Sequence, residues 1–180
     1  MTRLLDADLV GEPGSPAAAV ARAPVLVLGV GNVLMGDEGV GVHAIRRLEG
    51  EPGPAGVRLL DGGTGGVNLL ADFDGVRAIV LIDATRDGRA PGSLTYLRPE
   101  RVADLPRGLG AHDFGLKDLF AACALLGRLP EIHLFTVSVD RIEPMTTTLS
   151  APVAAALPSL EAAVRQQAET LARRFPVDRA

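Results

Sequence analysis

The segment spanning residues 25–48 constrains the fold of this chain more than any other feature. Residues 25–30, VLVLGV, form a continuous aliphatic run, which is typical of a strand buried on both faces of a sheet. A turn rich in glycine follows, and Val42, Ile45 and Leu48 then recur at helical spacing. A buried strand that turns through glycines into a helix indicates an α/β protein.

Two adjacent acids, Asp37 and Glu38, stand where this helix opens. A nucleotide-binding turn leaves its backbone amides and the helix N-terminus free for a phosphate. Carboxylates in that place repel phosphate and suit a cation or a hydrolytic role. The dinucleotide fingerprint is also incomplete, because Leu34 occupies the position of its third glycine. A nucleotide-binding α/β domain therefore stays only as an alternative.

The composition predicts one globular domain. The chain has 180 residues, of which 47% are apolar and 22% charged, enough for a sizeable core. The net charge of −4 gives no electrostatic case for binding nucleic acid or an anionic membrane. No apolar run approaches the length of a membrane span. Cys123 is the single cysteine, in an apolar run, and we expect it to pack in the core.

We expect the α/β domain to span residues 24–175. Residues 1–23 are rich in alanine, proline and glycine without a clear period, so we expect a disordered N-terminal extension, and residues 176–180 form a tail. The first residues contain acids and lack a sustained apolar segment, which argues against a signal peptide. We expect a cytoplasmic monomer that binds neither nucleic acid nor membrane.

The remaining signals alternate between strands and helices. We expect further strands at residues 57–60, 76–82, 93–97 and 132–139, and helices at 67–73, near 114–123 and at 152–174. This alternation predicts a three-layer α/β/α sandwich with a mixed, mostly parallel five-stranded sheet in the order 2-1-3-5-4. The connection between strands three and four is short, so strand 4 should be antiparallel.

Residues 98–110 have no convincing period and contain two prolines and several glycines. A loop of this length is often functional. We expect it to be exposed and mobile, with few residues to anchor it, and to flank a cleft.

Three polar residues stand at expected loop mouths: Glu38 after the first strand, Asp83 at the end of the third, and His112 before a helix. In a sheet of order 2-1-3, strands one and three flank the topological switch point, where open α/β sheets bind ligands. Two carboxylates and an imidazole there could hold a divalent metal with open positions. Each has a structural alternative, since acids also cap helices and form turns, and a histidine can simply begin a helix.

A glycine-rich turn covers residues 61–66, DGGTGG. Thr64 could act as a nucleophile, but a turn with so little side-chain bulk is explained more simply by close approach of a peptide backbone. We expect this turn and Gly31-Asn32 to line the cleft. If Gly63 has a negative φ, the change Gly63→Val should impair activity more than stability.

Four motifs, taken together and in order, resemble the nickel–iron hydrogenase maturation endopeptidases. They are GVGNVLMGDEGVG at 29–41, DGGT at 61–64, LIDA at 81–84 and AHDFGL at 111–116. The resemblance covers roughly residues 25–139, most of the expected domain.

The resemblance implies an aspartyl-type endopeptidase. Such enzymes remove a C-terminal extension from the hydrogenase large-subunit precursor, their partner, once nickel is inserted. Glu38, Asp83 and His112 match the family's metal-contacting residues and would also be the catalytic ones. Nickel would arrive with the substrate, and cadmium or zinc could replace it in the site. We expect the substrate chain to contact Gly31, Asn32, Asp37, Asp61, Gly62, Gly63 and Thr64. A non-catalytic nickel-binding assembly chaperone is the alternative from another class.

Overall fold

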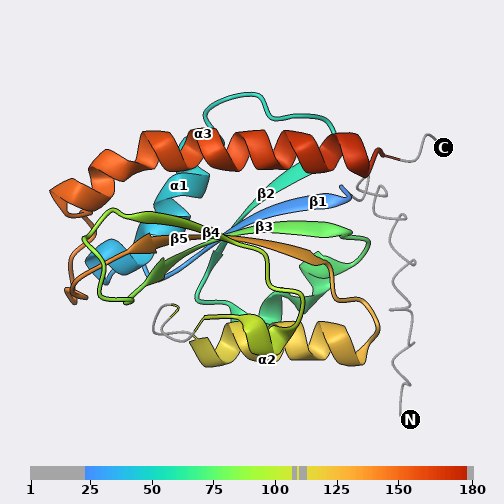
Figure 1. Cartoon of the computed structure of the whole chain (residues 1–180), viewed down its shortest axis with the longest axis horizontal. Coiled ribbons are helices and arrows are strands. Elements are labelled where there is room, and N and C mark those ends of the chain that lie inside the picture. The colour runs from blue at the N-terminus through green and yellow to red at the C-terminus, as the bar shows by residue number, and fades with distance from the viewer. Residues whose placement is uncertain (1–22, 107–108, 110–112, 178–180) are drawn as a thin grey trace, which may run out of the picture.

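A central five-stranded sheet organises the molecule (Figure 1). The computed structural model describes residues 23–106, 109 and 113–177. The strands are β1 (Val25–Val30), β2 (Val57–Gly63), β3 (Ala78–Thr85), β4 (Leu94–Leu97) and β5 (Glu131–Ser138). Their order is β2-β1-β3-β5-β4, and all neighbours are parallel except β4, which runs antiparallel to β5.

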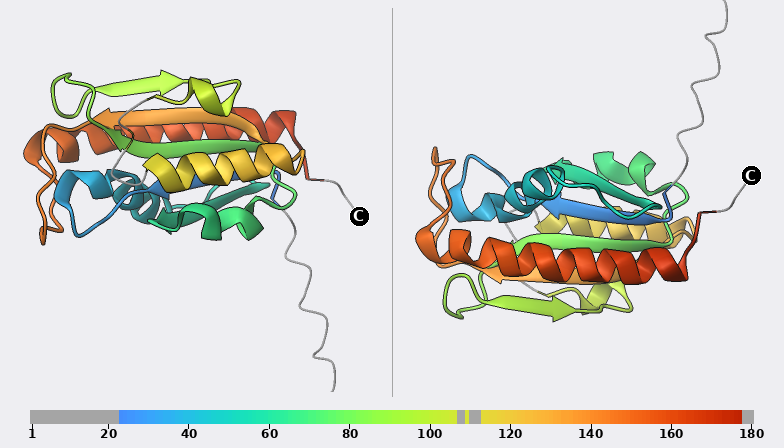
Figure 2. Two further views of the ribbon diagram at one scale, coloured as in Figure 1. Left: turned by 90° about the horizontal axis from the view of Figure 1, so that it is seen from below. Right: turned by 90° about the horizontal axis from the view of Figure 1, so that it is seen from above.

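Helices cover both faces of this sheet (Figures 1 and 2). On one face lie α1 (Val40–Leu48) and the long α3 (Ala151–Arg174); on the other lie α2 (Asp113–Leu125) and the 3-10 helix η2 (Gly66–Phe73). Two shorter 3-10 helices, η1 (Gly36–Gly39) and η3 (Val102–Asp104), sit in connections. The predicted three-layer fold, strand order and antiparallel fourth strand are confirmed.

The aliphatic runs form central strands because successive side chains enter opposite cores. In β1, Val25 and Val27 face α1 and α3, whereas Leu26 and Leu28 face α2 and η2. The parallel strands β3 and β5 divide in the same way. Cys123 is 1% exposed in the second core, as predicted.

Two strands run further than the sequence pattern suggested. β3 continues through Asp83 to Thr85, so this acid lies within the strand and not beyond its end. β2 continues into the glycine-rich turn as far as Gly63. Pairing with neighbouring backbone extends both strands: Asp83 lies opposite Thr136 of β5, and Gly63 opposite Val30 of β1.

The expectation that few residues anchor the loop at residues 98–110 is wrong for the part that the structure describes, whereas the expected exposure holds for Arg98, Glu100, Arg101, Ala103 and Asp104. Leu105 is 5% exposed and Leu109 1%, and both pack in the core beside α2. Leu109 also forms an antiparallel bridge to Thr85. The two leucines thus anchor a segment whose prolines had suggested a mobile loop. They do so because their side chains cover the apolar face of the sheet. Residues 107, 108 and 110 lie outside the described residues.

The predictions for the chain ends stay untested, since residues 1–22 and 178–180 lie outside the described residues. Among the helices that the structure describes, none is long and apolar enough to cross a membrane.

Candidate functional site

The candidate site lies at the carboxyl ends of β1 and β3, where the chain leaves the sheet in opposite directions. This is the topological switch point of the sheet, the usual ligand position in such folds. Glycines bring α1 unusually close to it. A Cβ on Gly41 would lie 2.4 Å from the carbonyl oxygens of both Ile82 and Val30. Only a residue without a side chain allows the start of α1 to sit against the strand ends.

Glu38 lies in η1, directly before α1, and is 1% exposed. Its backbone packs on the turn after β1: a Cβ on Gly31, which has φ 132°, would lie 2.0 Å from the Glu38 carbonyl oxygen. η1 also contacts β3, the strand that carries Asp83. The structure therefore brings the two predicted acids onto touching elements. Both acids are buried, because the elements that pack at the switch point also cover their side chains.

Asp83 is 3% exposed, and its Oδ1 accepts a hydrogen bond from the backbone N–H of Ala84 at 2.7 Å. It borders a pocket of about 20 Å³, which is room for roughly one water-sized group. The other residues that line this pocket are Val30, Gly31, Gly63, Thr64, Gly66 and Leu116. A single ion or water, with a peptide backbone above it, fits such a space better than a nucleotide does.

The predicted metal triad is only partly described. Glu38 and Asp83 are placed, but His112 lies outside the described residues. Among the side chains that the structure describes, in residues 23–106, 109 and 115–177, no three acids, histidines or cysteines gather as a metal site. A shared site thus depends on a third ligand such as His112, and the triad stays a prediction.

Asp37 is held away from the pocket. Its Oδ1 accepts a hydrogen bond from the backbone N–H of Ser150 at 2.6 Å, and its Oδ2 accepts one from the Ser150 hydroxyl at 2.7 Å. Ser150 is the residue that precedes α3, so a carboxylate from η1 sits at the N-terminus of that helix, where negative charge is favoured. Asp37 is 7% exposed and is not among the pocket-lining residues. The structure supports a positioning role for this side chain.

The glycine-rich turn divides into two parts. Gly63 and Thr64 border the pocket with Asp83, whereas Asp61 and Gly62 do not. Asp61 forms an ion pair with Arg46 at 3.1 Å and accepts a hydrogen bond from the Gly63 N–H at 3.0 Å. Thr64 is exposed, which suits contact with a bound chain.

The condition that we attached to Gly63→Val is not met, because Gly63 has φ 47°. A β-branched residue is strongly disfavoured in this left-handed region, so the substitution would disturb folding whatever the turn does. Gly62 is no better a probe, since a Cβ there would lie 2.6 Å from Leu28 Cδ1. Thr64 is the better position to test, because it is the exposed non-glycine residue of this turn that borders the pocket.

The turn after β1 is held by Asn32. Its Oδ1 accepts a hydrogen bond from the Leu34 N–H at 2.9 Å, and its carbonyl accepts one from the Met35 N–H at 3.0 Å. Gly31 borders the pocket, and its N–H donates to the Gly63 carbonyl at 2.9 Å, joining the two predicted loops. Asn32 shapes the loop; a contact with substrate stays a prediction.

Three pocket residues, Val30, Gly66 and Leu116, were missed as site residues. Gly66 has φ 51° and approaches α2 so closely that its Cβ would lie 3.2 Å from the Gly115 Cα. Leu116 of α2 closes the same side of the pocket. The second glycine pair of the turn was the available signal for Gly66, whereas nothing in the local sequence distinguishes Leu116 from an ordinary core leucine.

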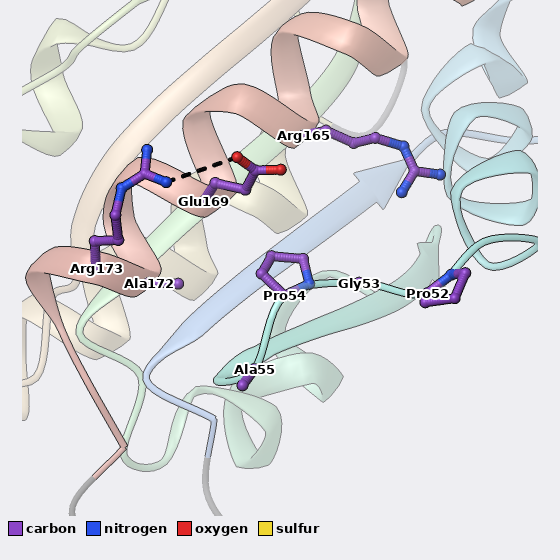
Figure 3. Close-up of a pocket in the computed structure, with 8 residues that line it drawn as sticks. All are labelled: Pro52, Gly53, Pro54, Ala55, Arg165, Glu169, Ala172 and Arg173. Atoms are coloured by element: carbon purple, nitrogen blue, oxygen red, sulfur yellow. Dashed lines mark ion pairs between the residues drawn. The ribbon is translucent and has the colours of Figure 1, made fainter.

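A wider pocket, of about 480 Å³, lies at the opposite end of the sheet (Figure 3). The loop before β2 and the C-terminal half of α3 line it through Pro52, Gly53, Pro54, Ala55, Arg165, Glu169, Ala172 and Arg173. Its charges are already paired: Arg173 with Glu169 at 3.8 Å, and Arg165 with Glu51 at 3.1 Å. This pocket gathers no buried acid, and we do not assign it the chemistry.

Comparison with known proteins gives a consistent picture. A family described as hydrogenase maturation protease matches residues 42–167. The hydrogenase expression/formation protein HoxM of Azotobacter vinelandii is 38% identical over 157 residues, covering 83% of this chain and 73% of that protein. The hydrogenase 2 maturation protease of Escherichia coli (strain K12) is 36% identical over 149 residues, covering 79% and 91%.

Solved structures agree. The hydrogenase maturating endopeptidase HybD from E. coli superimposes with a TM-score of 0.71 at 32% identity, covering 86% of this chain and 94% of that one. HybD from Thermococcus kodakarensis, a [NiFe] hydrogenase maturation protease, gives a TM-score of 0.68 at 31% identity, covering 80% and 98%. The chain belongs to the hydrogenase maturation protease family, and it is a peptidase.

Proposed function

We propose that this protein removes the C-terminal extension of a nickel–iron hydrogenase large-subunit precursor after nickel insertion. The observation that carries the proposal is the pair of buried acids, Glu38 and Asp83, on touching elements at the switch point of the sheet. Membership of the family supports the reaction class.

Nickel enters this scheme as part of the substrate. Carboxylate oxygens and an imidazole nitrogen are suitable ligands for a borderline divalent ion, and three protein ligands leave positions for a water or a carbonyl oxygen. Glu38, Asp83 and His112 would bind the nickel of a loaded precursor and so position the scissile bond. A precursor without nickel lacks the group that completes the site, which would make cleavage a checkpoint for metal insertion.

The chain to be cut would lie across the glycine-lined mouth of the pocket. Gly31, Gly63 and Gly66 line this mouth, so a peptide backbone can approach without meeting side chains. The exposed Thr64 hydroxyl could donate or accept a hydrogen bond there. A cytoplasmic location and a monomeric state stay predictions from the sequence.

The deciding experiment incubates the protein with nickel-loaded and nickel-free precursor and follows intact mass. We expect the loaded precursor to lose a C-terminal fragment and the nickel-free one to stay whole. A stable complex without loss of mass would indicate an assembly chaperone. Cleavage of both forms at equal rates would remove nickel recognition but keep the endopeptidase.

A further inference from the structure

Two large apolar side chains are exposed beside the candidate site. Leu34, in the turn after β1, is 52% exposed, and Met145, between β5 and α3, is 87% exposed. We call these two residues the Leu34–Met145 rim. The two connections that carry them lie side by side at one end of the molecule, coloured blue and orange in Figure 2.

Backbone pairing holds the two connections together. The Thr146 N–H donates to the Leu34 carbonyl at 3.2 Å, and the Gly36 N–H donates to the Thr146 carbonyl at 2.7 Å. Met35 and Thr146 thereby form a parallel bridge, with Leu34 and Met145 as the preceding residue on each side. The rim is therefore part of a defined structure, whose first connection leads within four residues to Glu38.

The backbone of Met145 is strained. Its φ is 62°, and no other non-glycine residue that the structure describes has a positive φ. The left-handed region crowds the Cβ of an ordinary residue, and glycine adopts it freely. Burial does not offset this strain, because the side chain is almost fully exposed. Strained residues of this kind cluster at functional sites.

We infer that the Leu34–Met145 rim is an apolar docking point for the precursor chain that the protein cleaves. The inference rests on the proposed function and adds a specificity element to it. The occupant follows from continuity, since Leu34 belongs to the same connection as Glu38, and Asp37 of that connection binds Ser150 at the end of the connection that carries Met145. A chain whose scissile bond sits at the pocket passes over this end of the molecule. The flexible thioether of Met145 can adapt to an apolar side chain of that chain.

The molecule offers a matched control. Leu125, the last residue of α2, is 89% exposed, and this end of α2 lies at the opposite end of the sheet from the two connections that carry the rim (Figure 1). It has ordinary helical geometry and is not among the residues that line the pocket. A general effect of removing exposed apolar surface would therefore appear in Leu125→Ser as well as in the rim variants.

The experiment measures the processing rate against the concentration of nickel-loaded precursor for Met145→Ser, Leu34→Ser, Met145→Gly and Leu125→Ser, with the Tm of each. We expect both serine variants of the rim to raise KM at least about fivefold while kcat stays within about twofold, because a contact remote from the bond contributes binding. Leu125→Ser should match the wild type. Met145→Gly should raise KM as well, yet raise Tm, because glycine relieves the left-handed strain.

Each outcome decides something. Wild-type protein that does not cut loaded precursor overturns the proposed function and the docking role with it. Wild-type cleavage with an unchanged KM in both serine variants overturns the rim alone. A Tm that falls in Met145→Gly together with activity would show that Met145 stabilises the fold. A wild-type dimer that Met145→Ser converts to a monomer would assign the rim to a second copy of this chain.

Discussion

The two ends of the sheet use charge in opposite ways. At the amino end of β5, Glu131 meets His133, Arg98 and Arg174 at 2.6–3.0 Å. At the other end, Glu38 and Asp83 are buried beside glycines, and none of the described residues that line the pocket there is an arginine or a lysine. At the amino end, the acidic and basic side chains pair with one another. At the carboxyl end, two carboxylates are buried close to the pocket, where they would stabilise a cation. Pocket size alone would have selected the wrong end, since the wider pocket has paired charges.

The largest expected effect is on activity, from removing either buried acid. Glu38→Gln and Asp83→Asn keep the side-chain size and remove the charge, so each should lower the processing of nickel-loaded precursor by about a hundredfold or more. Glu169→Gln, in the wide pocket of Figure 3, should cleave like the wild type. Equal losses of processing activity in all three variants would contradict the assignment of the active site to the carboxyl end of the sheet.

The next effect is on stability and tests the close packing of α1. Gly41→Ala places a Cβ 2.4 Å from two carbonyl oxygens, so we expect the free energy of unfolding to fall by about 3 kcal/mol. The control is Gly53→Ala in the far pocket, where a Cβ would meet nothing within 4 Å and stability should hardly change. Urea denaturation of both variants measures the difference. A Gly41→Ala protein as stable as the wild type would mean that α1 can move off the strands.

A smaller loss is expected for the link between Asp37 and Ser150. Asp37→Ala removes both hydrogen bonds and the carboxylate at the start of α3, and should lower the free energy of unfolding by about 1–2 kcal/mol. Ser150→Ala keeps the backbone bond and should lose less. Thermal unfolding of the two variants ranks them, and an identical Tm for Asp37→Ala and wild type would contradict the positioning role.

The smallest expected effect is on the pH dependence of stability, and it comes from His133, near the amino end of β5. Burial lowers the pKa of His133, although Glu131 beside it acts in the opposite direction. Its Nδ1 lies 2.6 Å from the Tyr96 hydroxyl and 3.1 Å from Gln167 Nε2, with Arg98 and Arg174 close enough to oppose protonation. A lowered folded pKa means that neutral His133 stabilises the fold above the ordinary histidine pKa of about 6.5. That contribution is lost as the pH falls through the folded pKa.

His133→Gln should therefore flatten the decline in unfolding free energy between pH 7 and the acid range. His43, whose pKa is lowered by burial and by Arg46, contributes in the same direction, so His43→Gln is the matched comparison. Denaturation at several pH values measures the slopes. A steeper slope in His133→Gln would reverse the assigned sign.

Much of the site followed from local patterns. The aliphatic runs predicted central strands, and the acids after them lay near the switch point because parallel strands end at the same edge of a sheet. Gly63 and Gly66 of the glycine-rich turn have positive φ values, which glycine adopts freely, and the expected approach of a peptide backbone to this turn stays a prediction. The anchored loop was missed because Leu105 and Leu109 are isolated apolar residues in the sequence and become core only once the sheet face is formed.

By itself, then, the sequence determined the layers and the strand order of the fold, since these depend on residue periodicity. It also determined the acids and glycines around the pocket, since some of those positions can be filled only by glycine. The tertiary structure decided what each polar group does. Asp37 and Glu38 are neighbours in η1, yet the Asp37 carboxylate is bound by Ser150, more than a hundred residues away, whereas the Glu38 side chain is buried at the switch point. The left-handed conformation of Met145 likewise carries no local signal, and the residue after it, Thr146, pairs with the loop after β1. Partners distant in sequence fix such roles, and only folding brings them together.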